Sequence, residues 1–285
     1  IDVTEGGDQA RTAVERAFGW FEYVERVCSR FDENSEVVSL SRLPGRPLRV
    51  SRTLFQLIEF ALALNRLSNG AFDVTVGGLM ESRGFDRNYR TGGRHGFAGA
   101  IAPALAGEIV LDAEERTVML ARPFLLDLGA VAKGLAIDLA ARELGRFAMF
   151  SIDAGGDIYV AGQPEKGGWR VGVQDPERGG AAREILKVAD AAVCTSGGYQ
   201  RVTERPGQHH VLDPRTRVSP GDVLSATVVA PNAMLADGLS TALFILGAEG
   251  LALVATSGAH GMVIGKELGR QATAGFDSMV VEVAA

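Results

Sequence analysis

Residues 127–138 combine an acid, a run of small residues and a single lysine, reading Asp-Leu-Gly-Ala-Val-Ala-Lys-Gly-Leu-Ala-Ile-Asp. Asp127 and Lys133 flank this run, whose glycines and alanines let a ligand approach the backbone closely. A carboxylate and an ammonium group there would hold two ends of a charged ligand, and free amides at a helix start would suit phosphate. The alternative is that the small residues only serve packing where a strand meets a helix.

A second polar pair lies in the apolar segment 236–244. Asp237 and Thr241 are four residues apart, so a helix places both side chains on one face. Carboxylate and hydroxyl oxygens suit a hard cation such as Mg²⁺. The alternative is that Asp237 caps the helix N-terminus and that the Thr241 hydroxyl bonds back to the preceding turn.

Two further polar stretches are candidates for a site. Residues 195–199 form a hydroxyl-rich turn after an apolar run, and Thr195 and Ser196 would offer hydrogen bonds without charge. His209 and His210 lie beside an acid, but neighbouring residues of an extended segment point to opposite sides. We therefore retain only His210 as a candidate.

The elements that must position these residues follow from the spacing of apolar side chains. Helices are expected over 11–30, over 52–67 with Ser51 or Thr53 as N-cap and Gly70 in a left-handed conformation, and from 236 onward. A further helix that runs through Leu144 is expected after a tight turn of small residues at 129–134. Strands are expected at 71–76, 109–111, 118–120, 123–126, 150–153, 158–160, 169–173, 185–188, 191–195 and 225–230. Residues 82–98 are expected to form a mobile loop, and Phe31 reads as an aromatic anchor of the polar segment 29–36.

The composition is that of a globular chain with a large core. The chain has 285 residues, of which 46% are hydrophobic, and a net charge of −6. It has no basic run, which argues against a nucleic-acid binder. Cys28 and Cys194 lie in apolar contexts and are expected to be small buried residues. The sequence begins at Ile1, which leaves room for a removed signal peptide or lipid anchor, and no run approaches the roughly 18 uninterrupted apolar residues of a spanning helix.

Five stretches, taken in order, resemble the ApbE family of FAD:protein FMN transferases. They are 29–36, 70–77, 127–138, 195–199 together with 210–216, and 236–241. The resemblance implies an α+β fold of two related, intimately packed halves with a flavin cleft between them. It also implies that residues 1–285 form a single domain of this type.

The resemblance implies a reaction as well. Family members use magnesium and cleave the pyrophosphate of FAD, attach FMN through a phosphoester to a threonine or serine hydroxyl of an acceptor flavoprotein, and release AMP. The implied partners are thus FAD and an acceptor protein, without nucleic acid. The family also suggests an extracytoplasmic or periplasmic location with a membrane anchor, while a cytoplasmic location stays open.

Site roles come from the resemblance position by position. Phe31 lies where an aromatic residue stacks on the flavin, and His210 is the candidate base for the acceptor hydroxyl, with Asp237 as a second catalytic residue. The implied magnesium ligands are Asp237, Thr241 and the carbonyl of Ala130. The implied cofactor contacts are Phe31, Ala71, Phe72, Asp73, Asp127, Lys133, Thr195, Ser196 and Gly197.

The chain departs from the family pattern at Ser41, at Asp153–Ala154, at Gly198 and at Arg217. None of these positions is a predicted metal ligand or the candidate base. A looser acceptor cleft would let water replace the acceptor, so an FAD pyrophosphatase yielding FMN and AMP is an alternative. The third alternative is a flavin-binding protein without turnover, against which Asp237, Thr241 and His210 argue.

Overall fold

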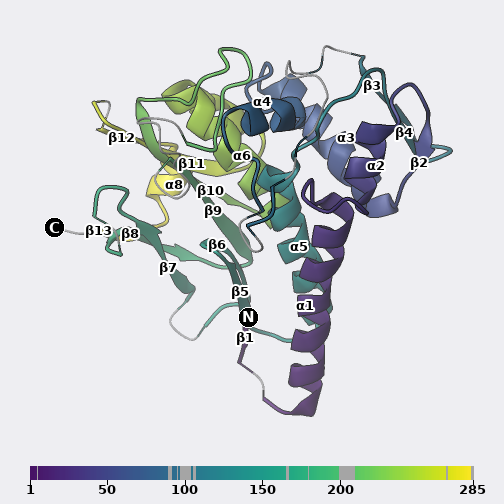
Figure 1. The fold of residues 1–285 in the computed structure, drawn as a ribbon. Coiled ribbons are helices and arrows are strands. Elements are labelled where there is room, and N and C mark those ends of the chain that lie inside the picture. The colour runs from purple at the N-terminus through teal and green to yellow at the C-terminus, as the bar shows by residue number, and fades with distance from the viewer. Residues whose placement is uncertain are drawn as a thin grey trace. The chain divides into compact units, whose positions relative to one another are not determined.

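The computed structural model describes residues 1–4, 6–88, 92–94, 96, 104, 107–164, 167–178, 180–198, 209–267 and 269–283. The chain divides into two compact units (Figure 1). Unit 1 comprises residues 1–21, 133–200 and 220–285, and unit 2 comprises residues 22–132 and 201–219. Helices α1 (Asp8–Cys28) and α5 (Gly129–Leu144) each begin in one unit and end in the other.

Unit 1 contains a seven-stranded antiparallel sheet in the order β1-β5-β6-β9-β10-β11-β12. Its strands are β1 (Asp2–Val3), β5 (Phe150–Ala154), β6 (Asp157–Ala161), β9 (Ala191–Gly197), β10 (Val223–Ala230), β11 (His260–Gly265) and β12 (Gly269–Ala272). Gly155 and Gly156 have positive φ angles and form the tight turn between β5 and β6. The strands expected at 150–153 and 158–160 are therefore confirmed.

A second sheet of unit 1 has the order β13-β8-β7 and is made of β7 (Trp169–Gln174), β8 (Ala182–Val188) and β13 (Val280–Val283). Apolar side chains of both sheets and of the short helix α8 (Ala274–Asp277) form one buried cluster. Its members are Val160, Val171, Val173, Leu186, Val188, Val193, Val229, Met262, Ile264 and Phe276. The two sheets thus share a core, as in a β-sandwich.

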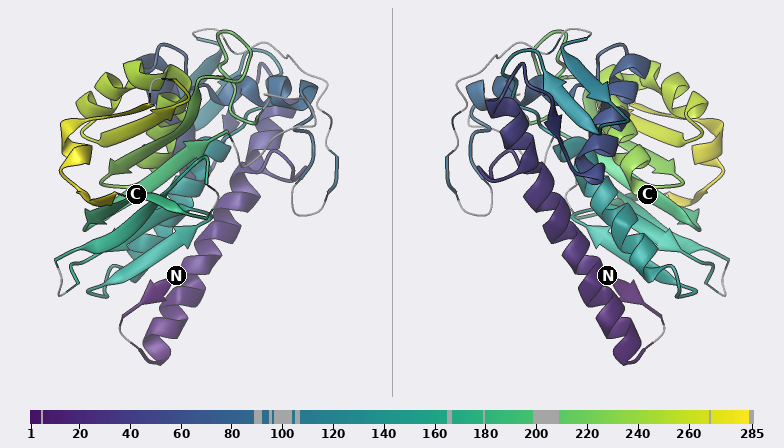
Figure 2. Two further views of the ribbon diagram at one scale, coloured as in Figure 1. Left: turned by 90° about the vertical axis from the view of Figure 1, so that its left-hand side faces the viewer. Right: turned by 90° about the vertical axis from the view of Figure 1, so that its right-hand side faces the viewer.

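Helix α6 (Ala233–Leu246) packs across β9 and β10 (Figures 1 and 2) and is followed by η2 (Gly247–Gly250) and α7 (Leu251–Thr256). The segment Ala233–Thr256 is long and apolar enough to cross a membrane by length and composition. Its side chains Leu239, Leu243 and Phe244 are fully buried within the fold. Packing of a core helix therefore accounts for its apolar composition.

Gly134 on α5 lies against the start of α6. A Cβ atom at this position would lie 2.4 Å from the carbonyl oxygen of Ala233 and 2.6 Å from the Cα of Met234. Because these are backbone atoms, Gly134→Ala must push the two helices apart, and we expect it to lower the free energy of unfolding by about 1–3 kcal/mol. Urea denaturation monitored by circular dichroism measures this change.

Gly19→Ala is the matched control, because Gly19 also lies in a helix, α1, and a Cβ atom added there would meet no atom of another element within 4 Å. The same substitution is expected to stabilise the protein there by up to about 1 kcal/mol, through helix propensity alone. A loss of stability at Gly19 equal to that at Gly134 would contradict the close-approach explanation.

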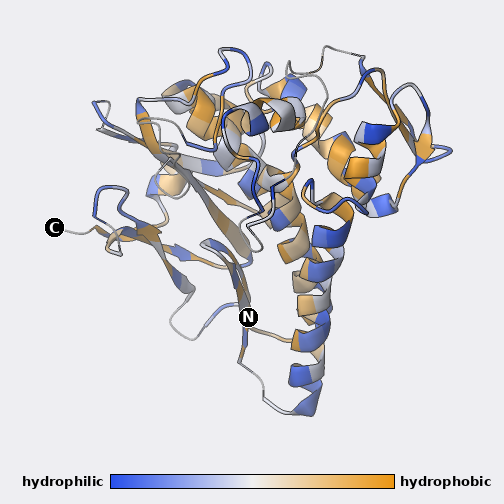
Figure 3. Ribbon diagram, in the orientation of Figure 1, coloured by the Kyte–Doolittle hydropathy of each residue, from blue (hydrophilic) through white to orange (hydrophobic). Residues whose placement is uncertain are grey.

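Unit 2 is built mainly from helices with one small sheet. Its helical elements are α2 (Glu36–Arg42), α3 (Arg52–Leu67), η1 (Val74–Val76) and α4 (Gly77–Ser82). Its sheet has the order β2-β4-β3 and consists of β2 (Leu48–Arg49), β3 (Ile109–Asp112) and β4 (Thr117–Leu120). Ser51 is the N-cap of α3 and accepts a hydrogen bond from the N–H of Leu54, and Gly70 has a positive φ angle after the helix end. The α1 helix carries polar and apolar residues along its whole length (Figure 3), and its buried residues Ala10, Ala13, Ala17 and Val24 recur at the spacing of one helix face.

The expected strand at 71–76 is wrong. Asp73 instead accepts hydrogen bonds at its Oδ1 from the N–H and the hydroxyl of Thr75, both at 2.8 Å, and so caps the short helix η1. Local bonding of an aspartate to the backbone two residues ahead favours a helical turn over an extended chain. Helix α2, capped by Ser35, follows the polar segment and was not expected.

The apolar run 123–126 does not belong to any strand of the three sheets, so this prediction is also wrong. Its backbone is paired with the segment of η1 and α4: Gly77 donates to the Leu125 carbonyl at 3.1 Å, and Asp127 donates to the Val74 carbonyl at 2.7 Å. The run is nevertheless buried, which explains its apolar composition. Of the loop expected at 82–98, residues 89–91, 95 and 97–98 lie outside the described residues.

Candidate functional site

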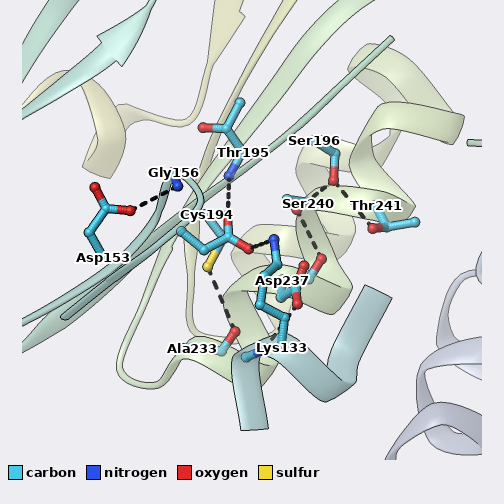
Figure 4. A network of polar contacts seen from close by, with 12 residues as sticks. Lys133, Asp153, Gly156, Cys194, Thr195, Ser196, Ala233, Asp237, Ser240 and Thr241 are labelled. Carbon is cyan, nitrogen blue, oxygen red and sulfur yellow. Dashed lines mark hydrogen bonds and ion pairs between the residues drawn. The ribbon is translucent and has the colours of Figure 1, made fainter. Parts of the chain in front are cut away.

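In unit 1, two buried carboxylates and one lysine lie together (Figure 4). Lys133, on α5, forms an ion pair with Oδ2 of Asp157 at the start of β6. Asp237, on α6, accepts a hydrogen bond at its Oδ2 from the N–H of Gly134 at 3.1 Å. Asp157 and Asp237 are 2% and 4% exposed, so both carboxylates are almost fully removed from water.

The sequence folds locally to hold this cluster. Asp138, one turn beyond Gly134 on α5, accepts hydrogen bonds from the N–H groups of Ala233 and Met234 at 2.7 and 3.0 Å. These bonds fix the first turn of α6 on α5, which the glycine allows to come close. Asn232 is the N-cap of α6, so the alternative in which Asp237 caps this helix is wrong.

Hydroxyl groups surround the polar face of α6. The Ser196 hydroxyl lies 2.8 Å from that of Ser240 and 3.2 Å from that of Thr241, and Ser240 donates to the backbone carbonyl of Asp237 at 2.9 Å. Figure 4 shows Ser196, Ser240 and Thr241 pointing toward one another. Thr241 is therefore engaged with β9.

The alternation of side chains along β9 separates two residues that the sequence placed together. Ser196 faces α6, whereas the Thr195 hydroxyl lies 2.9 Å from that of Thr227 on the neighbouring strand β10. The N–H of Thr195 donates to Oδ1 of Asp157 at 3.2 Å. Thr195 thus supports the cluster through its backbone, and Gly197 ends β9 as a buried residue.

Electrostatics differ among these groups. Burial raises the pKa of Asp237 to about 8, and the neighbouring charges of Asp157 and Asp138 add to this, while the charge of Lys133 and the Gly134 N–H oppose it. Burial alone lowers the pKa of Lys133, but the charges of Asp237 and Asp157 outweigh it and raise that pKa well above its ordinary value. The lysine therefore stays charged at neutral pH.

The raised pKa of Asp237 has a consequence for stability. The folded protein holds a proton on Asp237 more tightly than the unfolded chain, so without a divalent cation its contribution to stability falls as the pH rises from about 4 to about 8. Asp237→Asn removes this contribution. The melting temperature measured in EDTA should therefore fall less between pH 5 and pH 9 for this variant than for the parent. Parallel curves for the two proteins would contradict the assignment.

In unit 2, Asp127 is held by charge and by hydrogen bonds. Its Oδ2 lies 2.7 Å from Nε of Arg30, and its Oδ1 accepts from the N–H of Gly129 at 2.9 Å. Burial raises the pKa of this carboxyl, but the charge of Arg30, these hydrogen bonds and the charge of His210 together lower it. Asp127 is thus a fixed negative charge that acts on His210.

The segment 71–73 is largely enclosed. Ala71 and Phe72 are buried, and burial raises the pKa of Asp73 against the hydrogen bonds from Thr75. Any contact of Phe72 with a ligand would therefore involve its backbone. Phe31 is half-buried, with the guanidinium carbon of Arg30 4.0 Å from its ring centroid. Its contact with a flavin stays a prediction.

The two adjacent histidines differ in burial. His209 is buried and is bonded through its backbone to Ser219, whereas His210 is half-buried. Cys28 and Cys194 are both buried free thiols, which confirms the prediction for them.

Two groups of predicted residues thus emerge. Unit 1 brings together Lys133, Ser196, Asp237 and Thr241, and unit 2 brings together Phe31, Asp127 and His210. Ala130 lies in the first turn of α5 within unit 2, so its place in a magnesium site stays a prediction.

Sequence reasoning assigned no role to Asp157, Ser240 or Arg30. Asp157 follows the Gly155-Gly156 turn at the start of a strand, and an acid in that position was the available signal. Ser240 and Arg30 are the chain neighbours of the predicted residues Thr241 and Phe31. Adjacent side chains usually point in different directions, so the sequence offered no reason to include these two in the site.

Comparisons with known proteins find relatives of one family. The model of the ApbE family matches residues 1–263. An FAD:protein FMN transferase of Treponema pallidum is 32% identical over 274 residues, which cover 85% of this chain and 73% of that protein. One from Rhodobacter capsulatus is 33% identical over 222 residues, covering 75% of this chain but 42% of that protein, so the chain spans less than half of this relative.

Solved structures show the same fold. The ApbE protein of Thermotoga maritima has a TM-score of 0.85 at 30% identity, covering 98% of this chain and 94% of that one. A mutant of the flavin transferase ApbE of Vibrio cholerae has a TM-score of 0.81 at 25% identity, with the same coverage of 98% and 94%. The expected mixed helix and sheet fold is therefore confirmed, and the chain belongs to the ApbE family.

Proposed function

We propose that this protein is an FAD:protein FMN transferase. It cleaves the pyrophosphate of FAD, attaches FMN to a threonine or serine hydroxyl of an acceptor flavoprotein, and releases AMP. The observation that carries the proposal is the cluster of Lys133, Asp157 and Asp237, with the hydroxyls of Ser196 and Thr241 beside it. The names of the relatives support the same reaction.

A magnesium ion fits the donor set of unit 1. Asp237 is a buried carboxylate whose pKa is raised because nearby acids and burial disfavour its charge, and a bound cation would reverse that effect. Thr241 adds a neutral oxygen, as Mg²⁺ sites built from one or two carboxylates and water allow. Within the described residues, no three His, Cys, Asp or Glu side chains form a group that could hold a metal ion, so the proposed site has Asp237 as its one carboxylate ligand. When bound, Mg²⁺ would neutralise charge that develops on phosphate oxygens.

Lys133, His210 and Asp127 have separate roles in the transfer. The acceptor hydroxyl oxygen attacks the phosphorus on the FMN side, the bond from that phosphorus to the bridging oxygen breaks, and AMP leaves with the electron pair. Lys133 is the fixed positive charge that stabilises phosphate oxygens during this transfer. His210 takes the proton of the acceptor hydroxyl, and the charge of Asp127 stabilises the imidazolium that results.

The products distinguish this function from its alternatives. The protein is incubated with FAD and Mg²⁺, with and without a flavoprotein domain that carries a flavinylation threonine. FMN and AMP are followed by chromatography and covalent flavin by gel fluorescence. Covalent flavin that depends on the acceptor supports the transferase, free FMN and AMP alone indicate a pyrophosphatase, and intact FAD indicates a binding protein. Location outside the cytoplasm and a membrane anchor stay predictions.

A further inference from the structure

Arg30 is a buried cation that connects three segments of unit 2. It is only 7% exposed. Its Nε donates to Oδ2 of Asp127 at 2.7 Å, its Nη2 donates to the carbonyl of Phe85 at 2.7 Å, and its Nη1 lies 3.5 Å from Oε1 of Glu81. One guanidinium thus ties the end of α1 to α4 and to the segment that leads into α5.

The same guanidinium covers one face of the Phe31 ring. Its central carbon lies 4.0 Å from the ring centroid, within the range of a cation–π contact. Phe31 itself is half-buried, so its ring is reached by a ligand only away from this covered face. A planar ligand at Phe31 would therefore stack in one orientation, on the side opposite Arg30.

A buried ion pair adds little net stability compared with an apolar contact of the same size, because removing both charges from water costs much of what their attraction returns. Such groups can instead specify one geometry. Arg30 contacts both Phe31 and Asp127. Both residues are expected to contact the cofactor, and the charge of Asp127 also acts on His210. Their relative placement depends on the planar fork of a guanidinium.

We propose that Arg30 is a positioning residue for the flavin ring. It holds Phe31 in the orientation that accepts the isoalloxazine ring on the face away from Arg30, and it fixes Asp127 relative to that ring. The ligand concerned is the flavin portion of FAD or FMN. This inference rests on the proposed function only in so far as the protein binds flavin; turnover is not required.

A double-mutant cycle tests the inference. The dissociation constant for FAD is measured by fluorescence titration in EDTA for the parent, Arg30→Met, Phe31→Leu and the double variant. We expect each single substitution to weaken binding about tenfold, as losing one stacked aromatic contact does. In the Phe31→Leu background, Arg30→Met should weaken binding much less than in the parent, because the ring that it positions is already absent and only its effect through Asp127 remains.

Arg270→Met is the matched control for lost stability. Arg270 likewise pairs with two carboxylates, Glu184 and Asp277, and its guanidinium lies 5.9 Å from the ring centroid of Phe276. The Arg270→Met substitution should lower the melting temperature without changing the affinity for FAD. If Arg30→Met folds poorly, Arg30→Lys replaces it in the cycle. Lysine keeps the charge but not the planar fork, so this variant should bind FAD more weakly than the parent.

Two results would overturn the inference. One is an Arg30→Met variant that binds FAD as the parent does. The other is an equal effect of this substitution in both backgrounds, which would indicate a general loss of structure. If the parent binds FAD but transfers no FMN, the proposed transferase function is wrong. The double-mutant cycle still tests the role of Arg30 in that case, because it measures only FAD binding.

Discussion

Asp237→Asn is expected to reduce FMN transfer by about a hundredfold or more, the effect of removing a preorganised electrostatic group at a reacting centre. The substitution keeps the volume of the side chain and its acceptor for the Gly134 N–H. It removes the only charge that α6 contributes beside Lys133 among the contacts described for this cluster. FAD affinity should change little, since a flavin contact is not among the roles of this residue. Covalent flavin on an acceptor domain, measured against time, gives the rate.

Asp153→Asn is the control for this prediction. Asp153 lies on β5 near the same cluster (Figure 4), is exposed, and accepts a hydrogen bond from the N–H of Gly156 at 2.9 Å. An asparagine keeps that bond, so the transfer rate should stay close to that of the parent. The pair also separates function from stability, because Asp237→Asn should be the more stable protein at high pH in EDTA. Transfer by Asp237→Asn at more than about a tenth of the parental rate would contradict the account.

His210→Ala is expected to lower the transfer rate by about 10² to 10⁴ by removing a general base. The neutral imidazole is the form that accepts a proton, so the parental rate should rise with pH through the range in which histidine titrates. The variant should lack this rise. Transfer rates between pH 5.5 and pH 8.5, measured at saturating FAD, provide the comparison.

His209→Asn serves as the neighbouring control. The described hydrogen bonds between His209 and Ser219 involve the backbone of His209, so they survive the substitution. This variant should keep most of the transfer rate and the rise with pH. A flat profile in the parent would remove His210 from the mechanism and leave the remainder of the proposal standing.

The sequence predicted best those features that local chemistry determines. The helices α1 and α3 follow from apolar spacing, α3 also from its N-cap Ser51, and the strands β5 and β6 follow from their short apolar runs. The turn expected at 129–134 is wrong, because these residues already belong to α5. One error, the strand at 71–76, arose because the local cap formed by Asp73 was missed, and another arose where tertiary pairing decided the structure. The run 123–126 has strand-like residues, but its backbone pairs with η1 and α4.

The site shows the same division. The pair Asp237 and Thr241 was predictable from a spacing of four residues on one helix, and both side chains do point to one polar cluster. Asp157 could not be assigned, because its partner Lys133 is 24 residues away on the helix α5 and only the tertiary fold brings the two together. Thr195 and Ser196 were grouped by sequence, and strand alternation separates them.

The most direct test of the central claim is the intact mass of an acceptor flavoprotein domain after incubation with this protein, FAD and Mg²⁺. The account predicts a mass increase equal to one FMN joined with loss of water, located by peptide mapping on a threonine or serine, with one AMP released per FMN attached. An acceptor whose target hydroxyl residue is replaced by alanine should gain no mass. An unchanged acceptor mass while FAD is converted to free FMN and AMP would contradict the claim that this chain transfers FMN to protein.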